Sequence, residues 1–417
     1  MSKNLMRYKV KPPKHEPDFV SLEELPLSDY ENDYAGLTKQ QAAKRFWAAF
    51  LILFLSGFLV FIFANRQKLT YENIINWVQY EMLSQSQFKG TGYPVSFVGS
   101  RIDCGNFISM GNYIVYSSNT SFVTLNSSAG EIFKKQIRYH QPILKKSDNR
   151  LLIYNLGSRG FEINSVNKTI YESETDDKII TGDISLNGTY ALVTQAEGFL
   201  SKLHVFKDNK EVYTYYFLND YINSVSLNKD GTKGILSGIS SNSSSLKTKI
   251  FLFDFSKLKP VHEYEFDNNL IYDIKYLTET IAVTIGSSSA YHINLNKWEI
   301  TERKYDEMLL TGYDISTDSS SYVLSLSRNG DGRACTLMYY SAIINMDKAI
   351  STELKISSVS IYKDRIAVLS QNKGYLYNRS GEMLRETDAG NDSRQIRLYN
   401  EHRAYILGAT EIRQIDF

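Results

Sequence analysis

The chain has 417 residues, of which 42% are hydrophobic and 22% charged, and this composition excludes a wholly disordered protein. Its 30 Tyr and 21 Phe, against only seven Pro, favour β-sheet over a collagen-like chain. The net charge is +1, and residues 46–417 hold equal numbers of acidic and basic residues. Such a neutral domain lacks the positive field of a nucleic-acid-binding protein, so no nucleic-acid partner is expected.

Residues 1–45 combine prolines with interleaved charges and few apolar positions. This segment cannot bury enough apolar surface to offset the entropy of an ordered chain. We therefore expect a disordered tail over residues 1–45.

A run of twenty residues without a charge follows, from Phe46 to Asn65. Twenty residues of helix span about 30 Å, the thickness of the hydrocarbon core of a bilayer. A cleaved signal peptide fits poorly, because the run begins far from the N-terminus and Phe63-Ala64-Asn65 supplies no cleavage site. A buried core helix would show a polar face, and none is present. The run predicts a single transmembrane helix over 46–65.

Basic residues near the membrane set the orientation, because they resist translocation. Lys39, Lys44 and Arg45 precede the apolar run, whereas only Arg66 and Lys68 follow closely. We expect a cytoplasmic N-terminus and an extracellular C-terminal domain in the cell membrane.

Helical spacing continues over Thr70–Gln87, with Thr70 as the expected N-cap. Its apolar stripe consists of Tyr71, Ile74, Ile75, Val78 and Met82. Gly90, Gly92 and Pro94 then favour a joint. Residues 66–92 are thus expected to form a juxtamembrane helix and hinge.

A repeat begins near residue 93, and its clearest copy runs from Ile184 to Val193. Each copy has an aliphatic anchor, alternating residues, a polar turn and a short apolar strand. The anchors are Ile108, Leu144, Ile184, Val225, Ile274, Ile315, Val359 and Ile396. Two further runs follow within each interval, as in Leu203–Phe206 and Val212–Phe217.

Four short strands recurring about every 40 residues are typical of β-propeller blades. The fold prediction is all-β, with an eight-bladed propeller over 93–417, or seven blades because the copies at Ile108 and Leu144 are weak. The last copy holds three strands, so Pro94–Val98 is expected to supply the fourth and close the ring. A β-sandwich or stacked smaller domains would not explain the near-constant spacing.

Cys104 and Cys335 fall in different repeats, and we expect two small buried residues rather than a disulfide. The six His are scattered without the spacing of metal ligands.

Four features of the sequence are candidate sites. Asp176-Asp177 could pair carboxylates but fits a turn better, and Asn329–Gly332 fits a hairpin turn better than a calcium loop. His140 could line the mouth of the ring, although a hydrogen-bonded structural role is favoured. Ser240–Ser245 lengthens one repeat and is expected to be a surface loop. No catalytic, cofactor-binding or metal residue is predicted, and no cofactor.

Val123–Phe133 and Gly374–Leu384 resemble the repeat of pyrroloquinoline-quinone propellers, although Phe133 and Leu384 stand where that family has Trp. The Trp-Asp pair that is typical of WD40 repeats is absent. Pro94–Arg101, His140–Pro142 and Lys178–Ile184 are similar to an uncharacterised family of single-pass bacterial envelope proteins, mainly Gram-positive. That resemblance implies a cytoplasmic tail, an anchor and an outer propeller, and no catalytic residue.

The leading hypothesis is a non-enzymatic, membrane-anchored protein that binds or scaffolds a protein or cell-envelope polymer on its propeller face. One alternative is an enzyme acting on envelope glycan or peptide, with carboxylates converging at the central channel. Another is a transmembrane sensor that signals through residues 1–45.

Overall fold

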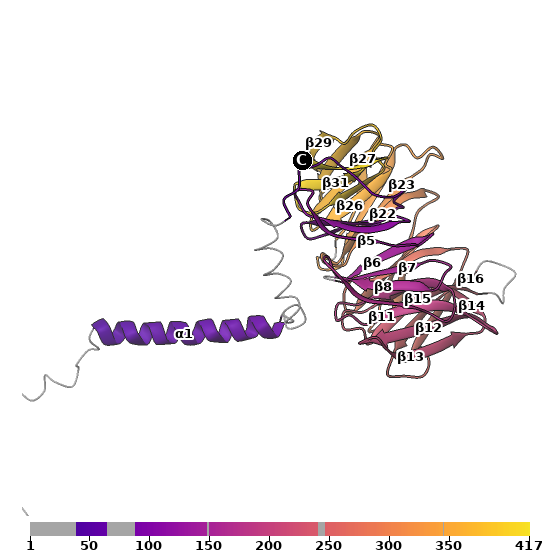
Figure 1. Cartoon of the computed structure of the whole chain (residues 1–417), viewed down its shortest axis with the longest axis horizontal. Helices are drawn as coiled ribbons and strands as arrows, with labels where there is room; N and C mark the ends of the chain where they lie inside the picture. Colours follow the sequence, from indigo (N-terminus) through magenta and orange to yellow (C-terminus); the bar gives the residue numbers. More distant parts are fainter. Residues whose placement is uncertain (1–38, 65–87, 148–149, 241–246, 345) are drawn as a thin grey trace, which may run out of the picture. The chain divides into compact units, whose positions relative to one another are not determined.

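The computed structural model describes residues 39–64, 88–147, 150–240, 247–344 and 346–417. The chain divides into two units, Met1–Leu69 and Thr70–Phe417. The first unit holds helix α1 (Lys39–Ala64), drawn in indigo in Figure 1. The residues 1–38 of the expected tail and the expected helix over 70–87 lie outside the described residues.

Helix α1 is one apolar helix that could span a membrane. Ala43–Val60 has a mean hydropathy of 1.7, and none of this window is buried against protein. Its large side chains are exposed, for example Leu53 at 74%. The helix begins at Lys39 rather than Phe46 because Gln, Ala, Lys and Arg are themselves good helix formers.

The second unit is an eight-bladed all-β propeller, with eight separate four-stranded antiparallel sheets. Blades 1 and 2 comprise β2 (Phe107–Met110), β3 (Tyr113–Ser117), β4 (Ser121–Leu125), β5 (Glu131–Gln136), β6 (Pro142–Ser147), β7 (Arg150–Asn155), β8 (Gly160–Asn164) and β9 (Thr169–Glu174). Blades 3 and 4 comprise β10 (Ile179–Ile184), β11 (Tyr190–Ala196), β12 (Phe199–Lys207), β13 (Lys210–Phe217), β14 (Asp220–Leu227), β15 (Lys233–Ser240), β16 (Lys247–Asp254) and β17 (His262–Asp267).

Blades 5 and 6 comprise β18 (Ile271–Tyr276), β19 (Ile281–Gly286), β20 (Ser289–Asn294), β21 (Glu299–Lys304), β22 (Leu309–Ser316), β23 (Ser321–Ser327), β24 (Cys335–Ser341) and β25 (Met346–Ser351). Blades 7 and 8 comprise β26 (Ser358–Tyr362), β27 (Arg365–Ser370), β28 (Lys373–Asn378), β29 (Met383–Asp388), β30 (Gln395–Leu398), β31 (Arg403–Leu407), β32 (Glu411–Asp416) and β1 (Val95–Ser96). All eight predicted anchors lie in the first strand of a blade, so the eight-bladed prediction is confirmed and the seven-bladed alternative is wrong.

The hydrophobic core is divided among the eight interfaces between neighbouring blades. Each buried cluster draws residues from two consecutive blades, and the cluster between blades 8 and 1 includes Tyr405 and Phe107. Phe133 and Leu384 pack against the clusters that their blades share with the next blade. A four-stranded sheet cannot bury both faces alone, so closure of the ring completes the core.

The ring closes through strand β1, as the sequence predicted. Val95 pairs with Ile412 and Ser96 with Glu411, which adds the fourth strand of blade 8 beside β32. The backbone N–H of Phe97 also donates to the carbonyl of Thr410 at 3.3 Å. In Figure 1 the indigo start of the propeller accordingly runs beside the yellow C-terminal strands.

The order of strands within a blade defines two faces of the ring. The first strands of successive blades contact one another around most of the ring, so they are the innermost strands. The residues of the fourth strands are exposed or partly buried, so these strands are outermost. We call the face with the turns between first and second strands the front face. The rear face carries the turns between second and third strands and the connections between blades.

Candidate functional site

One residue of each inner strand occupies an equivalent position near the front face. Each pairs with a second-strand residue that belongs to the core shared with the following blade, as Asp183 pairs with Ala191 and Arg397 with Tyr405. We call this set the axial ring. It comprises Ile108, Lys145, Asp183, Ser226, Lys275, Asp314, Ser360 and Arg397.

Asp183 of blade 3 links three blades. One oxygen of its carboxylate accepts the backbone N–H of Leu227 in blade 4 at 2.9 Å, and the other lies 2.7 Å from Nζ of Lys275 in blade 5. The side chain of Asp183 is only 5% exposed and that of Lys275 18%. Both carboxylate oxygens are therefore used to hold neighbouring blades together.

Asp314 repeats this arrangement three blades later. Its carboxylate accepts the backbone N–H of Ile361 in blade 7 at 2.8 Å, and its other oxygen lies 3.2 Å from Nη1 of Arg397 in blade 8. In blades 3–5 and again in blades 6–8, the blade between the aspartate and the cation carries a serine with the same role. The hydroxyl of Ser226 accepts the N–H of Tyr276 at 3.2 Å, and that of Ser360 accepts the N–H of Leu398 at 3.0 Å.

The axial ring does not present a free pair of carboxylates. Asp183 and Asp314 belong to different blades, and each is engaged by a cation and by a backbone amide. A general acid or base must exchange a proton with a substrate within its reach. The carboxylates of Asp183 and Asp314 instead bind groups of neighbouring blades, so they do not suit this role. Among the described residues, no group of three or more His, Cys, Asp or Glu side chains is arranged to hold a metal ion.

A chain of hydrogen bonds in blade 3 has the order nucleophile, base and acid. Nε2 of His204 lies 3.2 Å from the hydroxyl of Thr194, and Nδ1 lies 2.6 Å from the carboxylate of Glu211. Burial lowers the pKa of His204, although Glu211 opposes that shift. Burial alone would raise the pKa of Glu211, but hydrogen bonds from Thr214 and His204 outweigh it and lower the pKa. A neutral imidazole therefore donates to Glu211 and accepts from Thr194.

This arrangement does not form an accessible catalytic centre. Thr194 has no exposed surface and its hydroxyl points into blade 3, so no substrate carbonyl can reach it. The three side chains satisfy one another's hydrogen bonds, as buried polar groups must.

His292 is a second buried imidazole, between blades 5 and 6. Nε2 lies within hydrogen-bond distance of the hydroxyl of Tyr322, and the ring lies 4.0 Å from the centre of the Tyr340 ring. Burial, assisted by the charge of Arg303, lowers the pKa of His292 to about 4. The imidazole is neutral at pH 7 and packs as part of the interface.

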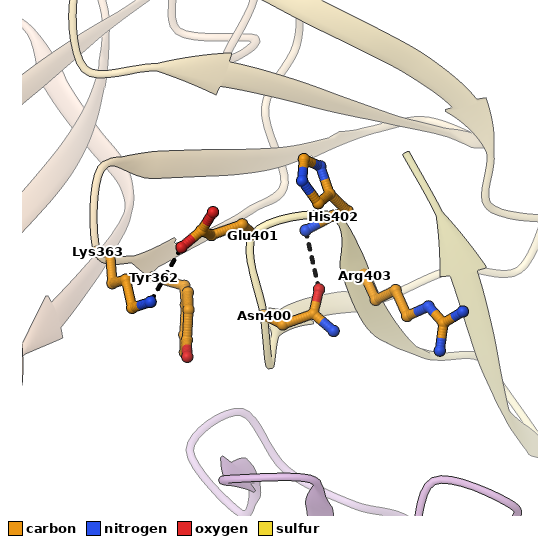
Figure 2. A pocket seen from close by; sticks show the side chains of 6 residues that line it. All are labelled: Tyr362, Lys363, Asn400, Glu401, His402 and Arg403. Atoms are coloured by element: carbon orange, nitrogen blue, oxygen red, sulfur yellow. Dashed lines mark hydrogen bonds and ion pairs between the residues drawn. The ribbon is translucent and has the colours of Figure 1, made fainter.

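A shallow pocket of about 440 Å³ opens on the front face between blades 7 and 8. Figure 2 shows its lining residues, Tyr362, Lys363, Asn400, Glu401, His402 and Arg403. Nζ of Lys363 lies 2.9 Å from Glu401, which raises the pKa of Lys363, and Nε of Arg403 lies 2.7 Å from Asp416. The charges of this pocket are thus paired with one another or with neighbours.

The rear face carries a larger depression and exposed apolar residues. A pocket of about 490 Å³ is lined by Ser288, Glu302, Lys304, Asp306 and Glu307. Near the rear ends of the inner strands of blades 4, 5 and 6 lie four exposed apolar or aromatic side chains, which we call the rear rim. They are Leu218 at 62%, Tyr221 at 41%, Tyr272 at 50% and Leu309 at 55% exposure.

Most features singled out in the sequence lie in turns. Asp176 and Asp177 lie between β9 and β10, and Asn329–Gly332 forms the turn between β23 and β24, both as predicted. Of the predicted loop Ser240–Ser245, Ser240 is the buried last residue of β15 and residues 241–245 lie outside the described residues.

Two expectations are wrong. His140 is exposed in the connection between β5 and β6, and in the described part of the chain its ring makes no hydrogen bond, so the structural role does not apply. Cys335 is buried, but Cys104 is exposed, because it lies in an irregular turn before β2 where strand alternation does not apply.

The pattern of repeats does not predict the axial ring, although the residues of the ring occupy regular positions beside the anchors. Lys145, Ser226, Lys275, Ser360 and Arg397 directly follow predicted anchors, and Asp183 and Asp314 directly precede them. An alignment of the copies by their anchors does not bring the residues of the axial ring into one column. In blades 3 and 6 the anchor follows the axial residue, whereas in most other blades it precedes it.

Comparison with known proteins identifies a family and similar folds. The model of a family of unknown function, DUF5711, matches residues 83–417. No curated protein sequence matches the chain. Among solved structures, BamB from Moraxella catarrhalis is 10% identical with a TM-score of 0.49, and the match covers 78% of this chain and 100% of that one.

Two further structures are similar to the ring. The Cps50 (Swd1) β-propeller domain from Myceliophteria thermophila is 11% identical with a TM-score of 0.46, covering 78% of this chain and 99% of that one. Hydrazine synthase from Kuenenia stuttgartiensis is 10% identical with a TM-score of 0.45, covering 77% and 98%.

Proposed function

The chain belongs to the family of unknown function DUF5711, and we propose that it is a membrane-anchored binding or scaffolding protein whose propeller lies outside the cell and docks a partner on its rear face. The partner is a protein or a polymer of the cell envelope. Helix α1 is the anchor, and the N-terminal tail is cytoplasmic.

The rear rim is the observation that carries this proposal. Tyr221, Tyr272 and Leu309 lie in the inner strands of blades 4, 5 and 6, and Leu218 lies in the connection before the first of these strands. All four side chains leave much of their apolar surface in water. Grouped apolar side chains on an otherwise polar surface mark a binding face, and tyrosine is enriched in such faces because it is amphipathic. Polar residues of the adjacent pocket, Glu302, Asp306 and Glu307, provide a rim that can orient the partner.

The charges of the axial ring support binding over catalysis. Its two carboxylates hold blades together, and the hydrogen-bonded chain from Thr194 to Glu211 is closed to substrate. A rigid ring with an apolar rim needs no catalytic group to act as a scaffold.

Site-specific cross-linking tests the docking face. A photoreactive residue replaces Tyr272 in the full-length protein in its own membrane, and a control carries it at Val212, which is 56% exposed on the outer strand β13. We expect a discrete adduct from position 272 and none from 212. Equal adducts at both positions, or none at 272, would contradict docking at the rear rim.

The location and orientation are tested separately with a reporter that is active only outside the cell. A fusion after Phe417 should be active and a fusion at the N-terminus inactive. The reverse result would place the ring in the cytoplasm.

A further inference from the structure

Along the axial ring, the order acid, serine and cation occurs twice, in blades 3–5 and in blades 6–8; we call these the two complete sectors. Blades 1 and 2 form a third sector that lacks this order. Blades 3 to 5 carry Asp183, Ser226 and Lys275, and blades 6 to 8 carry Asp, Ser and Arg at the same positions. In both sectors the cation binds the aspartate two blades before it. Blades 1 and 2 carry Ile108 and Lys145.

Lys145 has no acidic partner at the positions that serve the other two cations. The residue two blades before it is Arg397, which binds Asp314 instead, and the residue in the blade between them is the apolar Ile108. Within the described ranges, the ammonium of Lys145 makes no hydrogen bond or ion pair. Its side chain is partly exposed, so solvent and small solutes reach it.

The inner strands on one side of Lys145 are basic, and on its other side lies Asp183 of blade 3, whose carboxylate is already engaged by Lys275 and the N–H of Leu227. The inner strands of blades 8, 1 and 2 contain Arg397, Lys145 and Lys146 and no acidic residue. Lys146 donates to the carbonyl of Ser109 at 3.0 Å and keeps two further N–H donors. Because Arg397 is paired with Asp314, the positive charges of these strands that have no acidic partner among the residues that the structure describes are those of Lys145 and Lys146.

We propose that blades 1 and 2 form a binding site for a phosphate group, which pairs with Lys145 as an aspartate pairs with Lys275 and Arg397 in the rest of the ring. The anion restores the charge balance that Asp183 and Asp314 provide elsewhere in the ring. Lysine suits this role because its compact ammonium binds an anion as a point charge from several directions. The site lies inside the ring and needs neither the rear rim nor the membrane, so it goes beyond the proposed function.

Titration of the full-length protein in detergent with inorganic phosphate tests the site, with heat of binding as the readout and chloride held constant. A parallel titration uses short-chain polyphosphate, because the anionic group could belong to a free ion or to a polymer. Binding of phosphate alone identifies a small-anion site, and binding of only the longer chain identifies a polymer site. Both results support the proposal if they depend on Lys145.

Three variants test whether anion binding depends on Lys145. Lys145→Met should weaken binding about fivefold or more, as expected for the loss of a hydrogen bond between charged groups. Ile108→Asp keeps the lysine but places a carboxylate in the adjacent blade, and should weaken binding by a similar factor. Lys257→Met, at an exposed turn of blade 4, should leave binding unchanged.

Thermal melting separates loss of the site from loss of the fold. A Lys145→Met protein that melts like the wild type and binds phosphate and polyphosphate with unchanged affinity overturns the proposal. So does a wild-type protein that binds neither anion.

Discussion

The carbonyl oxygen of Phe88 lies against the α-carbon of Gly130, so close that there is no room for a β-carbon at position 130. The same carbonyl accepts a hydrogen bond from Nδ2 of Asn126 at 2.8 Å, and Oδ1 of Asn126 accepts the N–H of Gly130 at 2.7 Å. The segment that leads into the ring is therefore fastened to the turn between β4 and β5. Gly90 is equally confined against Ser128.

Replacement of Gly130 by alanine should release this attachment. The new methyl group displaces the segment around Phe88 and should cost about 1–3 kcal/mol, the usual range for overpacking. Limited proteolysis should then cleave near residue 88 faster than in the wild type, and thermal melting reports the loss of stability. Gly330→Ala is the control, because a β-carbon there meets no atom within 4 Å. Equal cleavage of both variants would show that Gly130 does not hold the segment.

Removal of strand β1 should open the ring. A chain lacking residues 1–98 loses the pairing of Val95 with Ile412 and the contact of Tyr93 with Tyr405, whose ring centres lie 5.3 Å apart. We expect a loss of about 3 kcal/mol or more from the vacated apolar contacts, and association through the exposed edge of β32. Light scattering after size exclusion checks the association. A chain lacking only residues 1–87 retains the strand and should stay monomeric.

The two aspartates of the axial ring should differ in their contribution to stability. Asp183→Asn and Asp314→Asn each leave a cation without its carboxylate, and we expect losses of about 2–3 kcal/mol. The loss should be larger for Asp183, whose side chain is 5% exposed, than for Asp314 at 22%. Urea unfolding measures both. Asp331→Asn is the control, since its pair with Arg333 is exposed and worth about 0.5 kcal/mol or less. A larger loss in the control would reverse this ranking.

The buried histidines should make the ring less stable in acid. The pKa of His292 is about 4 in the folded state against an ordinary 6.5, so the unfolded chain binds the proton more readily. Stability is therefore full above about pH 6.5 and falls towards pH 4, by roughly 3 kcal/mol for this group. His204, whose pKa is also lowered, acts in the same direction.

Unfolding by urea between pH 4 and 7 measures this dependence. His292→Gln should flatten it, whereas His402→Gln, at an exposed position, should leave it unchanged. A wild-type slope that survives the His292 substitution would contradict the assignment.

Replacement of Leu53 by arginine should impair anchoring. The position lies near the middle of Ala43–Val60, where an arginine costs about 3 kcal/mol of insertion. The measurement is the fraction of protein that stays in membranes after an alkaline wash. Leu53→Ile should remain bound, and equal retention of both variants would mean that α1 is not the anchor.

Several parts of the fold could be predicted from local sequence. The anchors of all eight blades, the closing strand near Pro94 and the turn at Asn329–Gly332 follow from short-range alternation and turn residues, which depend little on distant contacts. The exposure of Cys104 could not be predicted, because the chain leaves the strand pattern before β2. The confinement of Gly90 and Gly130 was also invisible, since it arises where two distant backbones touch.

Periodicity and composition within a few residues were enough to favour eight blades and to predict the closing strand and the apolar helix, whereas the choice of eight over seven blades came from the structure. Which side chains meet across blades depends on how the ring closes in three dimensions. Asp183 and Lys275 are 92 residues apart, and their ion pair exists because ring closure brings strands from separate blades to one axis. The same closure leaves Lys145 facing that axis beside Ile108 and Arg397, a juxtaposition that no local pattern encodes.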